Sequence, residues 1–290
     1  MTRDCITQSQ ADRLLRNKFV FIKGDSIQRF VYKDLVLLLE KGAYLTMAQL
    51  KLKGEMSFES DTLLEGSLLC ETTNSEDYRE VRQYCGSHNL IRLYYTTEII
   101  SNYTDNVLAA IDSGVKPDII ILNSCVWDLS RFSQSWVPKY GENIHKTMAK
   151  LKEILPPECI VMWNMSMPVS GNIVGGYFQP QVGEGQTCSM PSHSKKFFSA
   201  VAHYAKLSNC SDFEFSNWGC SRLWQYVCYS GMVANSHSTI MVDMHFHIRQ
   251  AVQSMKDGPP TIAVAYQRIT CLLLEHAAHV WDVEQYLPHR

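Results

Sequence analysis

The chain has 290 residues, of which 46% are hydrophobic, enough to bury a full core. Lysine and arginine number 27 against 29 for aspartate and glutamate, and this near-neutral balance argues against nucleic acid or an acidic membrane surface as a partner. No stretch approaches about 18 uninterrupted apolar residues, so we expect no membrane span. The polar start, Met1 to Gln8, has no signal-peptide pattern and predicts a cytoplasmic protein.

The distribution of cysteine, proline and glycine bears on domain organisation. The ten cysteines include no Cys-x-x-Cys pair, which argues against a zinc module and favours reduced, mostly buried thiols. No linker rich in Pro, Gly and Ser divides the chain, so we expect one domain over residues 1–290, with an irregular segment at about 171–238 and a helix within 194–206. Neither a cofactor nor a resident metal is expected.

In the first third of the chain the apolar pattern predicts a short helix within 9–18 and a buried strand at 19–23. A second helix runs from 27 to about 40 and ends at Lys41-Gly42, a basic last turn followed by a C′ glycine. Thr46 to Leu50 begins a third helix. Weak periodicity at 52–78 indicates an excursion over one edge of the sheet, and the charges from Tyr78 to Arg82 are spaced as on a solvated helix face.

The remaining elements alternate between strand and helix. Four aliphatic residues in a row, Ile119 to Leu122, indicate a central parallel strand covered on both faces. The other predicted strands are 90–95, 159–163 and 239–243, and the predicted helices are 103–111, 140–154 and 262–281. Strands joined through helices imply a parallel sheet with helices on both faces, which is a three-layer α/β/α fold.

The turn between the first strand and the helix after it, Gly24-Asp25-Ser26, is the first candidate site. Its serine is the last residue before the predicted helix, where the hydroxyl lies at the edge of the sheet. Backbone N–H groups and the positive end of the helix dipole at such a position suit a developing oxyanion. Ser26 is also a favoured residue type for a plain N-cap, so both interpretations remain open.

This turn resembles the first block of the SGNH (GDSL-type) hydrolases. The longer string 24–39 resembles the PC-esterase domain proteins within that superfamily. Further matches follow in the family's order, at 78–82, 123–128, 163–169 and 243–247. The resemblance runs nearly from end to end, and it implies an SGNH-like α/β/α domain that hydrolyses or transfers acyl esters of a small molecule or a glycan.

The resemblance also implies roles for individual residues. Ser26, in the block that begins with Gly24, would be the nucleophile and would supply one oxyanion donor through its backbone N–H. Asn123 would supply a second donor through its side-chain amide, or else would start a loop by bonding its own backbone. Trp163 and Asn164, expected just past a strand, would line the cleft or pack in the core.

Charged residues near the turn carry supporting roles in the same resemblance. Asp25 would fix the turn, or its carboxylate would hold a neighbouring arginine, of which Arg29 is the nearest. Arg79 or Arg82 would bind an anionic substrate group or buttress the serine loop.

The general base is the position at which this chain departs from the family. SGNH hydrolases carry the other two triad members in a late Asp-x-x-His block, which reads Asp-Gly-x-His in the PC-esterase pattern. Here the block reads Asp257-Gly258-Pro259-Pro260, so the aspartate is kept and proline occupies the histidine position. None of the ten histidines has an aspartate three residues before it. We therefore expect a catalytically impaired esterase, a candidate pseudoenzyme.

Several alternatives stay open. His247 or His245 could replace the missing base and yield an active esterase, since they stand two apart with Asp243 on one face of a strand. The same three residues could be interpreted as a metal site with two histidines and one carboxylate. A further alternative is a non-catalytic binding or interaction module. The unusual 210–260 region is either a genuine variant or a gene-model artefact.

Overall fold

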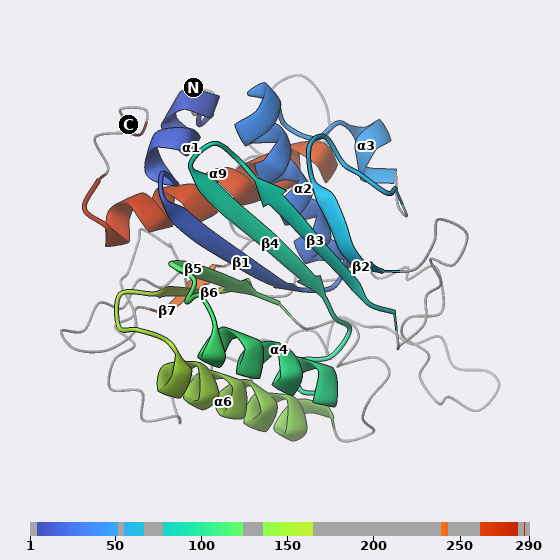
Figure 1. Cartoon of the computed structure of the whole chain (residues 1–290), viewed down its shortest axis with the longest axis vertical. Coiled ribbons are helices and arrows are strands. Elements are labelled where there is room, and N and C mark those ends of the chain that lie inside the picture. Colours follow the sequence, from blue (N-terminus) through green and yellow to red (C-terminus); the bar gives the residue numbers. More distant parts are fainter. Residues whose placement is uncertain are drawn as a thin grey trace, which may run out of the picture.

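The computed structural model describes residues 5–51, 55–66, 78–123, 136–164, 239–242, 262–283 and 287. Its centre is a seven-stranded sheet with the strand order β2-β3-β4-β1-β5-β6-β7 (Figure 1). The strands are β1 (Lys18–Gly24), β2 (Thr62–Gly66), β3 (Glu80–Cys85), β4 (Asn89–Tyr95), β5 (Ile119–Leu122), β6 (Ile160–Asn164) and β7 (Thr239–Val242). Pairing is parallel from β4 through β1 to β7 and antiparallel among β2, β3 and β4, so the sheet is mixed where a parallel one was predicted.

Helices cover both faces of the sheet, which confirms the predicted α/β layering (Figure 1). They are α1 (Gln8–Leu14), α2 (Ser26–Lys41), α3 (Met47–Lys51), α4 (Asn102–Ser113), α6 (Trp136–Ile154) and α9 (Ile262–Val280). Each had been predicted with small shifts at its ends, the largest being the earlier start of α6. Gly42 ends α2 in the left-handed conformation, with φ 65°, and its N–H donates to Leu38 O, as expected of a C′ glycine.

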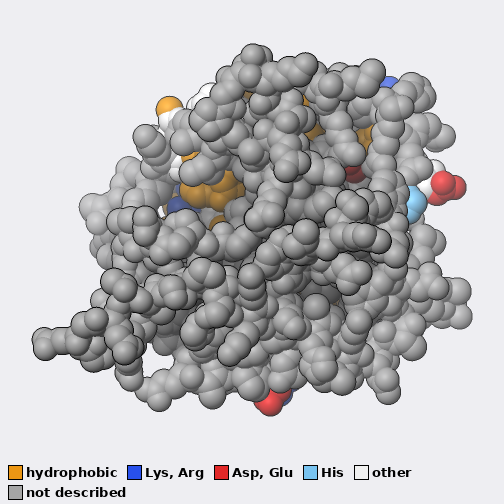
Figure 2. All heavy atoms as spheres, turned by 180° about the vertical axis from the view of Figure 1, so that it is seen from behind, with side chains coloured by type: hydrophobic (Ala, Val, Ile, Leu, Met, Phe, Trp, Pro, Cys, Tyr) orange, Lys and Arg blue, Asp and Glu red, His pale blue; other side chains and the backbone are white. Residues whose placement is uncertain are grey.

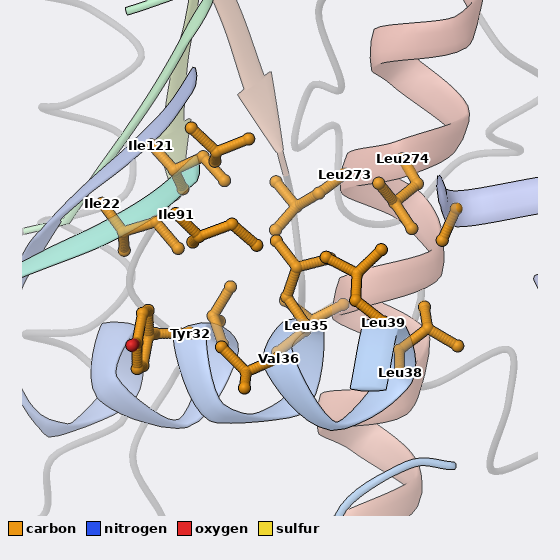
Figure 3. Close-up of a cluster of buried hydrophobic side chains, with 14 of the residues drawn as sticks. Ile22, Tyr32, Leu35, Val36, Leu38, Leu39, Ile91, Ile121, Leu273 and Leu274 are labelled. Carbon is orange, nitrogen blue, oxygen red and sulfur yellow. The ribbon is translucent and has the colours of Figure 1, made fainter. Parts of the chain in front are cut away.

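One core lies between the sheet and helices α1, α2 and α9. Figure 3 shows side chains of α2 pointing toward Ile22, Ile91 and Ile121 of the sheet, with Leu273 and Leu274 of α9 beside them. All of these side chains are buried. Since burying one such side chain contributes about 1.5–3 kcal/mol, this layer fixes the position of α2 on the sheet.

The opposite core lies between the sheet and helices α4 and α6. Alternation along the strands divides the two cores, because Ile121 and Met162 face one while Ile120 and Val161 face the other. Trp163 belongs to the second core and is 2% exposed. It lies within β6 rather than past its end, so its position favours packing over the expected place in a cleft.

The segment from Tyr78 to Arg82 corrects the prediction of a solvated helix face. Residues from Glu80 onward form strand β3, and the side chains of Glu80 and Arg82 are buried. Two residues apart on a strand share one face, so the charges point inward together. Strand β2, at the edge of the sheet, lies in the stretch that had been predicted as an irregular excursion.

In the view from behind (Figure 2), the acidic and basic side chains of described residues are visible singly. Their hydrophobic side chains are visible in several places in the upper part of the molecule, with the largest group at the upper left. Among the helices that the structure describes, none has the length and apolar character needed to cross a bilayer.

The buried carboxyl group of Asp34 predicts a pH-dependent stability. It joins α2 to α9 by accepting hydrogen bonds from Leu45 N at 2.8 Å and from the Thr270 hydroxyl. Burial raises its pKa to about 6 from 3.8, although both hydrogen bonds favour the charged form. Between about pH 4 and 6 the folded state holds a proton that the unfolded state has lost, so this contribution to stability falls as pH rises.

We therefore expect Asp34→Asn to gain about 1–3 kcal/mol of unfolding free energy relative to the unsubstituted chain when both are taken from pH 4 to pH 7. Urea denaturation at both pH values measures this difference. The matched control is Asp112→Asn, because Asp112 lies on the exposed side of α4. Parallel pH profiles for Asp34→Asn and the unsubstituted chain would contradict the prediction.

Candidate active site at the carboxyl ends of the strands

Gly24 ends β1 at the carboxyl edge of the sheet, where open α/β sheets bind ligands. Thr96 N donates to Gly24 O at 2.9 Å, and Asn123 N donates to Lys23 O at 3.0 Å, so the ends of β4 and β5 hold this turn. A Cβ atom at Gly24 would lie 2.7 Å from Asn123 O and 2.6 Å from the Gln28 side chain, and the backbone has φ +154°. Only glycine therefore fits between the two strands and α2.

Asp25, and not Ser26, is the N-cap of α2. Its carboxylate accepts a hydrogen bond from Ile27 N at 2.9 Å, while Ser26 is already the first residue of the helix. This corrects the expected boundary by one residue and removes the interpretation of Ser26 as a plain cap. Within the described part of the chain the Ser26 hydroxyl has no hydrogen-bond partner, so it is available at the helix start.

The structural role of Asp25 is supported by its surroundings. Its side chain is 3% exposed, and burial raises its pKa to about 6, against the lowering effects of Ile27 N–H and the Arg29 charge. Arg29 itself donates to Glu80 at 3.2 Å, so the alternative in which Asp25 holds this arginine as its ion-pair partner does not apply.

Asn123 follows β5 directly and is 2% exposed. Its Nδ2 donates to Asn164 O at 2.9 Å. Asn164 is the last residue of β6, and both polar atoms of its buried side chain lack a hydrogen bond to any residue that the structure describes. The two amides thus lie together at the ends of neighbouring strands.

Gln28 is a site residue that sequence reasoning missed. It is fully buried, its side chain lies against Gly24, and neither polar atom of its amide has a hydrogen-bond partner in the described part of the chain. Buried polar groups without partners are rare in folded proteins, and here two of them, on Gln28 and Asn164, flank the Gly24–Asn123 contact. A glutamine in an otherwise apolar helical face was the available signal.

A buried network of charges supports the start of α2 from the side. Glu80 accepts from both Arg29 and Arg82, and Arg82 also makes two hydrogen bonds to Asp61, at 2.9 and 3.0 Å. Burial would raise the pKa of Glu80, but the charges of Arg29 and Arg82 outweigh it and hold the pKa below its ordinary value. Of the two roles expected for Arg82, this geometry favours buttressing of the serine loop.

Helix α9 begins close to the start of α2. The rings of Phe30 and Tyr266 lie 5.2 Å apart, and one turn further along both helices Thr270 donates to Asp34. Phe30 is four residues after Ser26, and Tyr266 is four residues after the first residue of α9. The first turns of α9 therefore lie beside the amino-terminal half of α2.

The remaining predicted site residues lie outside the described ranges. These are Asp257 with Pro260, the alternative bases His245 and His247 with Asp243, and the irregular segment at 171–238. Among the described residues no group of three or more His, Cys, Asp or Glu is arranged to hold a metal ion.

Comparison with known proteins shows which proteins the chain is similar to. No protein-family model matches the chain. It is 40% identical to human PC-esterase domain-containing protein 1A over 285 residues, 97% of this chain and 56% of that protein. It is 39% identical to PC-esterase domain-containing protein 1B of Rattus norvegicus over 284 residues, 97% of this chain and 60% of that protein. The chain thus spans little more than half the length of these relatives, and over nearly all of its own length it is similar to PC-esterase domain-containing proteins.

Proposed function

We propose that this chain carries an SGNH-type site in which a serine attacks acyl esters. The general base of this site has been lost, so that catalysis is impaired. The observation that supports the serine site is that Asp25 and Ser26 have different roles at the start of α2. Asp25 caps the helix, and the hydroxyl of Ser26 therefore has no structural task among the described residues. A serine at this position can approach an ester carbonyl while backbone N–H groups face the oxyanion.

Two observations together support impaired catalysis: the residue at position 260 and the packing of α9 near the start of α2. The resemblance puts the triad histidine at position 260, where this chain has proline. That position is two residues before α9, whose first turns pack near the start of α2. A base at 260 would therefore be within reach of Ser26, and proline has no ring nitrogen that accepts a proton.

An active esterase with His247 as substitute base is the second candidate. Strand β7 ends at the same edge of the sheet as β1, because Asn164 pairs with Val242. Three strand spacings, about 14 Å, separate β7 from β1. Five residues can span at most about 17 Å, so the chain length from Val242 permits His247 to approach the serine.

Labelling with a fluorophosphonate, followed by intact mass spectrometry, tests the proposal. We expect slow labelling of the unsubstituted chain, no labelling of Ser26→Ala, and no effect of His247→Ala. Turnover of p-nitrophenyl acetate should stay within about tenfold of Ser26→Ala, because losing a triad member leaves only the contributions of oxyanion donors and binding.

The matched control is Ser101→Ala, since Ser101 is a helix N-cap whose hydroxyl accepts from Thr104 N at 3.2 Å. Ser101→Ala should cost about 1 kcal/mol of stability and leave labelling unchanged, whereas Ser26→Ala should abolish labelling and change stability by less than about 0.5 kcal/mol. Rapid turnover that His247→Ala abolishes would establish the active esterase instead. Absence of labelling in the unsubstituted chain would favour a non-catalytic binding module.

A further inference from the structure

The amino-terminal segment that contains Cys5 and Ile6 packs against the middle of helix α9. Ile6 is 2% exposed and belongs to the core that contains α9. The Tyr44 hydroxyl donates to Ile6 O at 2.7 Å and lies 3.3 Å from Cys271 Sγ. The backbone next to Cys5 is thereby held close to the Cys271 thiol.

A second contact holds the Cys5 side chain itself at this place. Gln267 Nε2 donates to Cys5 Sγ at 2.8 Å, and Gln267 is one helical turn before Cys271 on the same face of α9. The neighbouring Cys5 thiol, followed by burial, raises the pKa of Cys271 well above its ordinary value. Tyr44 and Gln267 therefore hold the two thiols close together where the segment packs on the helix.

The two thiols differ in access, which gives them different chemical roles. Neither cysteine is part of a disulfide, Cys5 is exposed, and Cys271 is buried. Thiol exchange requires an accessible thiol that can ionise, and a buried thiol ionises reluctantly. Cys5 is thus suited to meet an oxidant first, with Cys271 as the resolving thiol.

We propose that Cys5 and Cys271 form a reversible disulfide when the chain meets a small disulfide such as oxidised glutathione. The Cys5 thiolate attacks one sulfur of glutathione disulfide, forms a mixed disulfide and releases one glutathione thiolate. Cys271, losing its proton to solvent, then attacks Cys5 Sγ and displaces the second glutathione thiolate. The two protein thiols are oxidised by two electrons in total, and one glutathione disulfide is reduced to two glutathione molecules.

Formation of this disulfide would stabilise the helical layer that includes the start of α2. Helix α9 contacts α2 through Tyr266 and Phe30 and through Thr270 and Asp34. A bond from Cys5 to Cys271 would tie both ends of the described chain together across that layer, which restricts the unfolded chain strongly. This modification site is independent of the proposed ester chemistry.

The test is incubation of the purified chain at defined ratios of oxidised to reduced glutathione, followed by alkylation of free thiols and peptide mass spectrometry. We expect a linked Cys5–Cys271 peptide and a rise in melting temperature of about 5–10 °C, both reversed by reduction. Cys5→Ser should lose both effects and melt like the reduced chain, because Cys5 lies on the surface.

Cys85→Ser is the matched control, because Cys85 is likewise exposed and its Sγ likewise accepts from a glutamine amide, Gln83 Nε2, at 3.2 Å. No second thiol contacts Cys85 among the described residues. The control should retain both the linked peptide and the melting shift. Cys5 found only as a glutathione adduct, or linked to another cysteine, would overturn the proposal, as would a linked peptide without a melting shift.

Discussion

Replacing Pro260 by histidine is expected to raise the rate of p-nitrophenyl acetate hydrolysis by about 10²- to 10⁴-fold over the unsubstituted chain. A positioned general base contributes an acceleration of this size to attack by a hydroxyl group. The substitution would restore the spacing Asp257-x-x-His, in which the aspartate orients the imidazole. The measurement is the initial rate at pH 7–8, with the background of Ser26→Ala subtracted.

The described part of the molecule gives the physical reason to expect a gain at this position. The ring contact between Phe30 and Tyr266 and the bond from Thr270 to Asp34 fix the beginning of α9 beside the first turns of α2. Two residues before α9, position 260 can be only about 7 Å further along the chain. We therefore expect an imidazole at this position to reach the hydroxyl of Ser26.

Three variants separate a true base from other effects. Pro260→Ala removes the proline ring without adding an imidazole, and Pro259→His adds an imidazole one position away; neither should raise the rate by more than a few-fold. Ser26→Ala combined with Pro260→His should return to background. If the unsubstituted chain already hydrolysed the ester as fast as Pro260→His, another base would serve Ser26. The hypothesis of impaired catalysis would then be wrong.

Local pattern was sufficient for the elements that carry strong periodicity. The apolar run before Gly24 and the apolar-periodic residues after Ser26 predicted β1 and α2, and a glycine after a basic last turn predicted the end of α2. Ile119 to Leu122 form the buried parallel strand that a run of four aliphatic residues indicates. In each case the residues that specify the element lie within it.

The errors occurred where a distant partner decides the structure. β2 is an exposed edge strand without alternation, so only its pairing with β3 reveals it. Glu80 and Arg82 were assigned to a solvated helix because charges are usually exposed, whereas Arg29 and Asp61 neutralise them inside the fold. The spacing of two between these charges, and of two between Arg82 and the buried Tyr84, was a strand signal.

The candidate site was predictable in its backbone and less so in its side chains. The turn containing Ser26 and the strand end at Asn123 follow from the order of elements, since parallel strands bring their carboxyl ends to one edge. Which of two adjacent polar residues caps the helix depends on a single backbone angle, and Asp25 adopts the extended conformation that a cap requires. The apolar helical face around Gln28 was a local signal of burial, but its place beside Gly24 follows from packing between α2 and the end of β5.

Substituting Arg82 by alanine is expected to lower the free energy of unfolding by about 3–5 kcal/mol, the cost of leaving buried charges without their partner. The Arg82 side chain is 1% exposed and donates to both Asp61 oxygens and to Glu80. Loss of the guanidinium leaves Asp61 with the neutral donors Tyr32, at 3.1 Å, and Phe58 N, at 2.6 Å, and removes the positive charge that pairs with its buried carboxylate. Chemical denaturation measures the difference.

The matched control is Lys116→Ala, which removes an ion pair of similar length, 3.0 Å to Asp112, on the exposed surface. That change should cost less than about 0.5 kcal/mol, because water and salt screen exposed charges. Arg82→Lys should fall between the two, since an ammonium group cannot bond Asp61 twice and Glu80 once in the same plane. If Arg82→Ala were to cost no more than Lys116→Ala, the charges beside α2 would be solvated, and they could not be what holds the serine turn against the sheet.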